Sequence, residues 1–204
     1  MKLRVALAQV NPTVGDLIGN AALIKDGVAA AAAQGAQIAI FPEMVLTGYP
    51  VEDLALRPSF QQASRAALAK LATEIDSSIV AIVGYLDQVV TTDGAGKPQN
   101  KVAVISGGAV KASYAKCHLP NYGVFDEYRN FAPGDETLVV RIHGVDVGIA
   151  ICEDLWIDGG ITAQLAARKP GLVIVPNGSP YERNKDDIRL SLVTARARQA
   201  AAPL

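Results

Sequence analysis

The sequence predicts an α/β protein in which a mixed β-sheet is covered by helices. Three observations support this class. Helical and strand patterns alternate near both ends of the chain, short strands joined by tight turns fill the middle, and 50% of the 204 residues are hydrophobic while 19% are charged. This composition is sufficient to bury a core and argues against intrinsic disorder. We therefore expect a layered globular fold.

The first expected elements are a strand, a helix and a second strand. Alternating apolar residues predict a strand over 3–9. An alanine-rich stretch from about residue 20 to residue 34 has helical propensity, and Gly35 is placed to end it. The short apolar run 37–41 predicts a buried strand, which Pro42 closes because proline cannot donate to a β-ladder.

An amphipathic helix is expected next. Ser59, with Gln62 three residues later, forms a predicted capping box that marks the start of a helix. The apolar residues that recur at helical spacing, as expected for a helix that packs one face on a sheet, are Phe60, Ala67, Leu68, Leu71 and Ile75.

The middle of the chain predicts five strands, and three of their connections have the composition of tight turns. These turns are expected at 92–94, 107–108 and 144. The strands themselves are expected over 79–85, 101–106, 110–116, 137–142 and 145–152.

The last part of the chain continues the alternation of helix and strand. A helix is expected over 161–168, a strand over 172–175 and a polar helix over about 185–200. Because there is neither an internal repeat nor a linker composition, we expect one domain over 1–204. The chain stops directly after a helix, so we expect it to be cut rather than naturally ended.

Charge and composition exclude several classes of protein. Lys and Arg number 19 against 20 Asp and Glu, for a net charge of −1 and a pI near 6.1, whereas a nucleic-acid-binding domain normally has a pI above about 9. Apolar runs are far shorter than the roughly 20 residues of a membrane span, and the N-terminus lacks a signal-peptide pattern. We expect a cytoplasmic protein without nucleic-acid or membrane partners, with Cys117 and Cys152 as thiols and no metal site.

Cys152 is the first candidate for chemistry. On its predicted strand it shares a face with Gly148 and Ala150, which leaves room around the thiol. The residues after it leave the sheet, so the thiol stands at a strand-to-turn elbow where backbone N–H groups are able to bind an oxyanion. The alternative is a buried structural cysteine, since free cysteines are among the most buried residues. Position alone does not separate the two.

Glu43 and Lys116 also stand at predicted strand ends. Each has an ordinary interpretation, as a loop carboxylate or as a solvated charge at a sheet edge. The functional interpretation is that α/β sheets place their ligands at strand ends, where Cys152 is also expected. Cys117 must point to the opposite face from its neighbour Lys116, so only one of the two reaches a common site.

Two alternatives remain open at this point. His118 shares a face with Lys116 if the strand stays extended, so a Cys152–His118 pair is compatible with the pattern, whereas His143 is interpreted as a turn residue. A nucleotide-binding glycine loop would rest on residues 106–108 alone, and their position between two strands favours a hairpin instead.

Short motifs at the three strand ends resemble a known family. Phe-Pro-Glu at 41–43, Lys-Cys-His-Leu at 116–119 and Ile-Cys-Glu-Asp at 151–154 resemble the Glu, Lys and Cys motifs of the nitrilase, or carbon–nitrogen hydrolase, superfamily. More narrowly, the chain resembles the glutaminase domain of glutamine-dependent NAD+ synthetases over essentially its whole length. The segments that carry this narrower resemblance are 47–54, 119–127, 152–156 and 177–180.

The resemblance implies an α-β-β-α sandwich and a set of residue roles. Glu43 is then the general base, Lys116 stabilises the tetrahedral oxyanion and Cys152 is the nucleophile. Glu127 is a candidate for a second glutamate that orients the lysine. The implied glutamine pocket, in which Glu153 is suited to the α-ammonium group of the substrate, comprises Tyr49, Tyr122, Phe125, Glu153 and Ser179.

The resemblance also implies partners. Glutamine is the expected substrate, and its ammonia passes to a separate synthetase domain that uses ATP and Mg²⁺ to amidate deamido-NAD+. We expect no cofactor in this domain, a homo-oligomer, and a C-terminal part of the sandwich beyond Leu204, so that this chain alone does not make NAD+. The alternative is a free-standing amidase of the superfamily that acts on another small amide.

Overall fold

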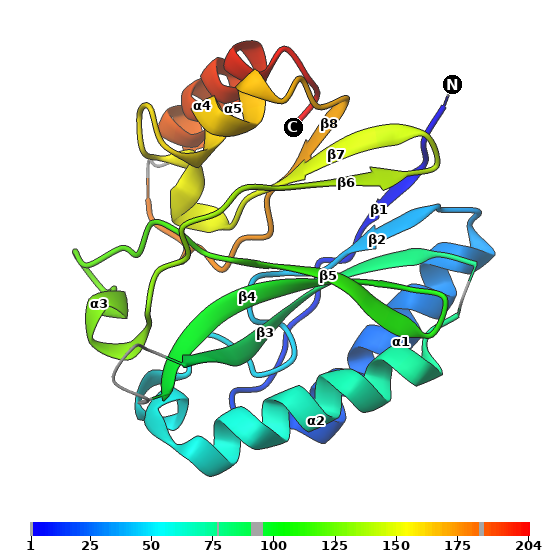
Figure 1. The fold of residues 1–204 in the computed structure, drawn as a ribbon, viewed down its shortest axis with the longest axis vertical. Coiled ribbons are helices and arrows are strands. Elements are labelled where there is room, and N and C mark those ends of the chain that lie inside the picture. The colour runs from blue at the N-terminus through cyan, green and yellow to red at the C-terminus, as the bar shows by residue number, and fades with distance from the viewer. Residues whose placement is uncertain (1, 77, 91–95, 184–185) are drawn as a thin grey trace.

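Two β-sheets lie face to face, with helices on both outer faces (Figure 1). The computed structural model describes residues 2–76, 78–90, 96–183 and 186–204. Figure 1 shows α1 and α2 beneath the larger sheet, and α4 and α5 on the far side of the smaller one. This arrangement confirms the predicted sandwich. The helices are α1 (Leu17–Ala33), α2 (Pro58–Glu74), α4 (Ile161–Ala167) and α5 (Asp186–Ala200).

The larger sheet is mixed and has the strand order β1-β2-β3-β4-β5. Its first three strands run parallel, β4 pairs antiparallel with β3, and β5 pairs antiparallel with β4. These strands are β1 (Val5–Leu7), β2 (Ile38–Ile40), β3 (Val80–Val90), β4 (Gly96–Ser106) and β5 (Ala109–Ala115).

The smaller sheet has the order β6-β7-β8, with β7 antiparallel to β6 and parallel to β8. Its strands are β6 (Leu138–Ile142), β7 (Val145–Ile149) and β8 (Leu172–Ile174). Three short helices that the sequence did not predict lie in the connections: η1 (Glu52–Leu56), α3 (Glu127–Asn130) and η2 (Cys152–Leu155).

Two hydrophobic cores hold the layers together. One lies between the sheets and includes Ile82 and Val147, both fully buried. The other lies between the larger sheet and its helices, where Ile24, Leu71 and Val83 pack together. Full burial of such a side chain stabilises the fold by about 1.5–3 kcal/mol relative to exposure. In the described part of the chain, no helix has both the length and the apolarity to cross a membrane.

Both long N-terminal helices begin at residues other than those predicted. Helix α1 starts at Leu17, because the Asp16 side chain accepts a hydrogen bond of 2.8 Å from Gly19 N and caps the first turn. The capping box predicted at Ser59 is wrong: α2 starts at Pro58, and Ser59 lies inside its first turn. Proline has the φ of a helix and no N–H to satisfy, so it begins a helix without a capping side chain.

The predicted strands are right in kind and differ in length. β3 and β4 extend well beyond the predicted ends, because they pair continuously from Ala81 and Ile105 to Val90 and Gly96. β7 ends at Ile149 instead of 152. The turn predicted at 92–94 lies outside the described residues.

Two predicted hairpin turns are confirmed. Gly107 and Gly108 have φ of +56° and +75°, and His143 and Gly144 have φ of +45° and +80°. Two successive positive φ values are the geometry of the tight turns that match the twist of paired strands. The glycines at 107–108 therefore serve a β4–β5 turn, which leaves the nucleotide-binding interpretation without its loop.

Candidate active site

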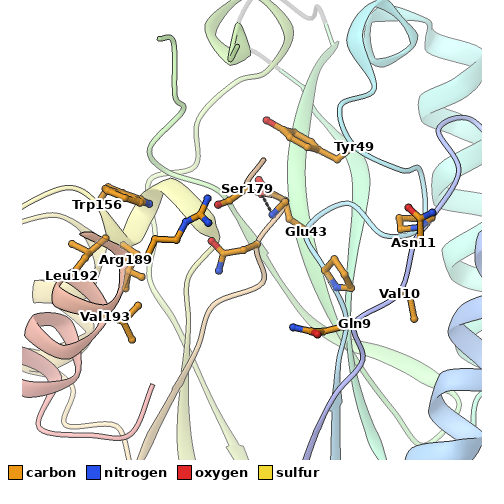
Figure 2. Close-up of a pocket in the computed structure, with 15 residues that line it drawn as sticks. Gln9, Val10, Asn11, Glu43, Tyr49, Trp156, Ser179, Arg189, Leu192 and Val193 are labelled. Carbon is orange, nitrogen blue, oxygen red and sulfur yellow. Dashed lines mark hydrogen bonds between the residues drawn. The ribbon is translucent and has the colours of Figure 1, made fainter. Parts of the chain in front are cut away.

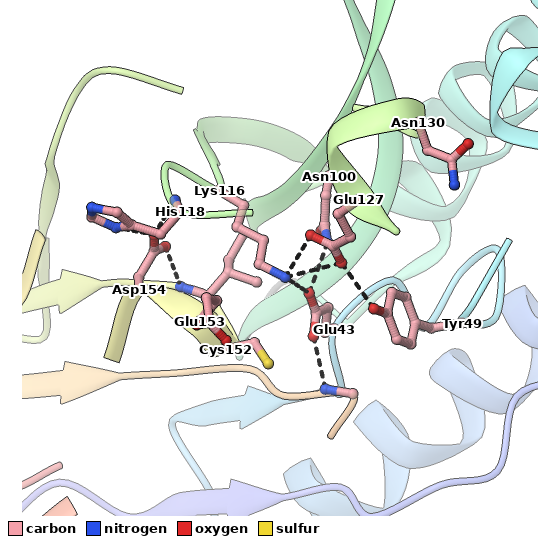
Figure 3. A network of polar contacts seen from close by, with 12 residues as sticks. Glu43, Tyr49, Asn100, Lys116, His118, Glu127, Asn130, Cys152, Glu153 and Asp154 are labelled. Carbon is pink, nitrogen blue, oxygen red and sulfur yellow. Dashed lines mark hydrogen bonds and ion pairs between the residues drawn. The ribbon is translucent and has the colours of Figure 1, made fainter. Parts of the chain in front are cut away.

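Three strand ends from both sheets converge on one buried network (Figure 3). Glu43 follows β2, Lys116 follows β5, and Cys152 follows β7. The loop that bears Glu43 approaches β3 so closely that a Cβ at Gly84 would overlap the main-chain nitrogen of Met44. Glycine at 84 therefore permits the approach that brings Glu43 over the sheet edge.

Lys116 is the charged centre of this network. Its side chain is completely buried, and its Nζ lies 2.8 Å from Glu43 Oε1 and 2.9 Å from Glu127 Oε2. Burial alone lowers the pKa of the ammonium, but the carboxylates of Glu43 and Glu127 outweigh burial and raise it above its ordinary value. Lys116 therefore holds its charge in a site that excludes water.

Glu43 is held on both of its oxygens. Oε1 accepts from Lys116 Nζ and, at 2.7 Å, from Asn100 Nδ2, and Oε2 accepts from Gly178 N at 2.8 Å. Asn100 is itself buried on β4, and its backbone carbonyl oxygen accepts from the backbone N of Lys116 at 2.9 Å. One asparagine thus connects the carboxylate and the lysine.

Cys152 is the first residue of η2 and not the last of a strand. Its φ of +43° is unusual for a residue with a side chain and costs about 1–3 kcal/mol. Its N–H donates to Pro176 O at 3.0 Å, which continues the extended pairing beyond β7, and its Sγ lies 3.7 Å from Ser179 Oγ. The elbow predicted from the sequence is present, three residues after the last residue of β7.

The Cys152 thiol is neutral at rest. It is only 3% exposed, and burial raises its pKa, as do the charge of Glu43 and a hydrogen bond to that carboxylate. The charge of Lys116 acts in the opposite direction and is outweighed. Activation of the sulfur therefore requires a base that removes the proton.

Glu127 lies on the other side of the lysine, on the short helix α3. Burial raises the pKa of its carboxyl group to about 7, against the opposing charge of Lys116. Tyr49 O–H donates to Glu127 Oε1 at 2.9 Å. Burial and the charge of Glu127 raise the pKa of this tyrosine, which therefore stays a neutral donor. Tyr49, expected in the substrate pocket, thus also supports the second glutamate.

A cleft of about 630 Å³ opens beside Glu43 (Figure 2). Figure 2 shows Arg189, Leu192 and Val193 of α5 on one side and residues 9–11 on the other. Tyr49 and Ser179, two of the five residues expected to bind substrate, line this cleft.

Two of the other three expected substrate residues line a second, smaller hollow of about 280 Å³, and Glu153 contacts one of them. Tyr122 and Phe125 line it, with their ring centres 5.6 Å apart and their planes at 73°. Tyr122 O–H donates to Glu153 Oε2 at 2.9 Å. Burial raises the pKa of Glu153, and the hydrogen bond from Tyr122 partly offsets this effect. The structure therefore divides the predicted pocket between two neighbouring hollows.

The alternative Cys–His arrangement is not the one in the structure. The ring of His118 points away from Cys152 (Figure 3), and its Nδ1 lies 3.1 Å from Asp154 Oδ1. Cys117 lies outside the network, where its Sγ is 3.4 Å from the hydroxyl of Tyr114. Burial raises the pKa of Cys117 to about 11, so this thiol is also neutral near pH 7. Among the described residues, no group of His, Cys, Asp and Glu is arranged to hold a metal ion.

Sequence reasoning missed two buried residues of this site, Asn100 and Asp154. Asn100 reaches Glu43 across 57 positions of the chain, and Asp154 reaches His118 across 36. No local pattern reports contacts of such separation. For Asp154 the available signal was a second acid directly after Cys152 and Glu153. Asn100 stands between Gln99 and Lys101, before the predicted strand, where no such signal marks it.

Comparison with protein families shows the family to which this chain belongs. The model of the family described as carbon-nitrogen hydrolase matches residues 4–203. The chain belongs to the carbon–nitrogen hydrolase family. This carbon–nitrogen hydrolase domain is 39% identical to the glutamine-dependent NAD(+) synthetase of Thermotoga maritima over 199 residues. The aligned region covers 96% of this chain and 33% of that relative. The domain is 41% identical over 206 residues to the synthetase of Xanthomonas campestris, with 99% and 36% covered.

Solved structures give the same result. The domain matches the glutamine-dependent NAD+ synthetase of Acinetobacter baumannii, solved with ADP, at a TM-score of 0.90 and 37% identity over 98% of this chain and 37% of that one. It matches a nitrilase-superfamily amidase of Nesterenkonia at 0.81 and 25% identity, over 98% of this chain and 73% of the amidase. In a structure of a mutant of that amidase, acrylamide has added to the active-site cysteine. The chain spans about a third of the length of the synthetases it matches.

Proposed function

We propose that this carbon–nitrogen hydrolase domain hydrolyses the side-chain amide of glutamine to glutamate and ammonia. The convergence of Glu43, Lys116 and Cys152 in one buried network carries the proposal. The glutamine dependence that the names of these relatives state supports glutamine as the amide.

In the first half of the reaction, Cys152 Sγ attacks the amide carbon while its proton moves to Glu43. Each carboxylate oxygen accepts two hydrogen bonds. Oε1 accepts from Lys116 and Asn100 and Oε2 accepts from Gly178 N, so we assign the second acceptor position of Oε2 to the thiol proton. The neutral state of the thiol supports transfer of the proton during attack over a preformed thiolate–lysine pair.

The tetrahedral intermediate places negative charge on the former amide oxygen. Lys116 Nζ and the backbone N–H of Glu153, the residue after the nucleophile, stabilise this oxyanion. Glu43 then returns its proton to the nitrogen, the C–N bond breaks and ammonia leaves. A glutamyl thioester on Cys152 remains. Water gives a proton to Glu43, attacks the thioester carbon and releases glutamate, while the sulfur regains its proton.

We further propose that the ammonia serves the amidation of deamido-NAD+ by an ATP-dependent synthetase, as the relatives' names suggest. The second candidate is a free-standing amidase for another small amide, which the likeness to the Nesterenkonia amidase supports. The two differ in substrate: a glutaminase recognises the α-amino and α-carboxylate groups, whereas a simple amidase needs only the amide.

The test measures glutamate and ammonia release from glutamine by this chain and by Cys152→Ala, with propionamide and acetamide as competing substrates. The proposal predicts turnover of glutamine at a kcat/KM well above those of the simple amides, and none by Cys152→Ala. Preference for the simple amides would establish the second candidate instead. Addition of an ammonia-dependent NAD+ synthetase, ATP, Mg²⁺ and deamido-NAD+ with amide-¹⁵N glutamine then tests whether the released nitrogen enters NAD+.

A further inference from the structure

Asp154 is a completely buried carboxylate with no role in the reaction steps above. It lies on η2, two residues after Cys152. Its two oxygens accept hydrogen bonds from residues adjacent in sequence to Cys152 and to Lys116 (Figure 3). The same side chain therefore contacts the backbone beside both Cys152 and Lys116.

On the cysteine side, two hydrogen bonds join Asp154 to Ile151 and close a small ring that contains Cys152. Ile151 N donates to Asp154 Oδ2 at 2.9 Å, and Asp154 N donates to Ile151 O at 3.0 Å. Cys152 lies inside this ring with its positive φ. A strained backbone conformation of this kind persists only where the surrounding contacts impose it.

On the lysine side, Asp154 fixes the chain where it leaves β5. Cys117 N and His118 N donate to Oδ1 at 3.1 and 2.8 Å, and His118 Nδ1 lies 3.1 Å from the same oxygen. Tyr114 O–H, two residues before Lys116, donates to Oδ2 at 2.7 Å. Contacts on both sides of Lys116 thus end on one carboxylate.

We propose that Asp154 is a positioning residue that sets the separation between the Lys116 ammonium and the Cys152 sulfur. The proposal rests on the proposed function, in which these two groups act on the same substrate carbonyl. The two groups come from different sheets, so packing within one sheet does not fix their separation. A displacement of about 1 Å between reacting groups is enough to cost about 10²-fold in rate.

An ionised carboxylate suits this task because it only accepts hydrogen bonds. Three backbone N–H groups and a tyrosine hydroxyl converge on it. An amide of the same shape must turn its NH₂ group toward at least one of these backbone donors. Asp154→Asn therefore keeps the volume of the side chain and loses the connection on one side.

The test compares Asp154→Asn and Tyr114→Phe with wild type in the full chain. Tyr114→Phe removes one donor to Oδ2 and leaves the three backbone contacts in place. Ser64→Ala is the control, because Ser64 is equally buried and its Oγ accepts from Leu86 N, between α2 and β3. For each protein, kcat and KM for glutamine are measured, thermal unfolding is recorded, and a diazo-ketone analogue of glutamine counts the reactive thiols.

The proposal predicts that Asp154→Asn lowers kcat per titrated thiol by about 10–10²-fold, with KM within threefold of wild type. Tyr114→Phe is expected to lower kcat per thiol by about threefold. Ser64→Ala should lower the unfolding temperature and leave kcat per thiol unchanged. If Asp154→Asn does not fold, kcat per titrated thiol of Tyr114→Phe tests the proposal instead.

A merely structural role gives a different result. It would lower the number of titratable thiols and the unfolding temperature in both variants, with kcat per titrated thiol within twofold of wild type, and this outcome would overturn the proposal. Absence of turnover in wild type would instead refute the proposed function, so the two failures are distinguishable.

Discussion

The buried network around Lys116 and the aromatic wall formed by Tyr122 and Phe125 differ in exposure. The side chains of Lys116 and Glu43 are completely buried, whereas Tyr122 is 51% exposed and the adjacent Val124 is 78% exposed. The network fixes charges by pairing them away from water, where an unpaired charge would be costly. In the wall, Tyr122 is half exposed to solvent, while its hydroxyl donates to Glu153. In the proposed function, reactivity therefore depends on the buried pairs, and most of the residues expected to contact the substrate lie where water also reaches.

This contrast predicts different effects of mutation. A change in the network leaves a charge without its partner and affects the chemical step. A change in the wall removes a contact that water partly replaces, so its effect should be smaller and should fall on substrate affinity.

The largest effect is expected for the nucleophile. Cys152→Ala should lower glutamine turnover by at least about 10⁴-fold, because no other group in the network is placed to form the thioester. Cys117→Ala is the matched control: its thiol is directed to Tyr114 and should be dispensable. Release of glutamate is the measurement. Turnover by Cys152→Ala within tenfold of wild type would contradict the mechanism.

The next largest effect is expected for the buried cation. Lys116→Met removes the partner of two buried carboxylates, and it should cost about 3–5 kcal/mol of stability and about 10²–10³ in kcat. Lys101→Met is the control, since Lys101 pairs with Asp87 at 3.1 Å near the surface. Denaturant unfolding and glutamine turnover check both variants. Equal losses in the two would mean that burial of the pair is unimportant.

Glu127 should make stability depend on pH. The folded state raises the pKa of this carboxyl group to about 7, so above the ordinary carboxyl pKa the unfolded state releases its proton first. This group therefore lowers the free energy of unfolding as pH rises through that window. Relative to wild type, Glu127→Gln should gain stability between about pH 4.5 and pH 7, by at most about 1.4 kcal/mol per pH unit.

Glu74→Gln is the control for this measurement. Glu74 is exposed, and its hydrogen bond to Lys25 lowers its pKa, so removal of its charge should change stability in the opposite direction. Denaturant titrations of the three proteins at a series of pH values give the comparison. A difference between Glu127→Gln and wild type that does not change with pH would show that burial does not perturb this carboxyl group.

The smallest effect is expected in the aromatic wall. Tyr122→Phe removes the hydrogen bond to Glu153, which is worth about 0.5–1.5 kcal/mol, so KM for glutamine should rise about two- to tenfold at unchanged kcat. Tyr128→Phe, an exposed tyrosine outside this wall, should change neither constant. A fall in kcat without a change in KM would place Tyr122 in the chemical step instead.

The sequence predicted those site residues that a local pattern marks and missed those held by long-range contacts. Glu43, Lys116 and Cys152 became candidates because each stands at a predicted strand end, where α/β sheets place their ligands, and the family resemblance supplied their expected roles. Asn100 and Asp154 were missed because their partners lie 57 and 36 positions away. Contacts of that range are fixed by tertiary packing within and between the sheets, which periodicity does not report.

Local errors had local causes. The start of α2 was misplaced because Ser59 satisfies the capping pattern, yet Pro58 before it already has a helical φ. The expected strand end at Cys152 was three residues late because extended pairing continues past Ile149, through Ala150 N to Ile174 O and Cys152 N to Pro176 O. Sequence pattern predicts apolar alternation well and the last ladder residue poorly.

The most direct test of the account labels the chain with a diazo-ketone analogue of glutamine and maps the adduct by peptide mass spectrometry. Neutral thiols at both cysteines imply little reaction with a simple electrophile near pH 7. A glutamine-shaped reagent should react at Cys152 because Glu43 is placed to take the thiol proton. We predict one adduct, on Cys152, that excess glutamine prevents and that Glu43→Gln abolishes. An adduct on Cys117 alone would contradict the account.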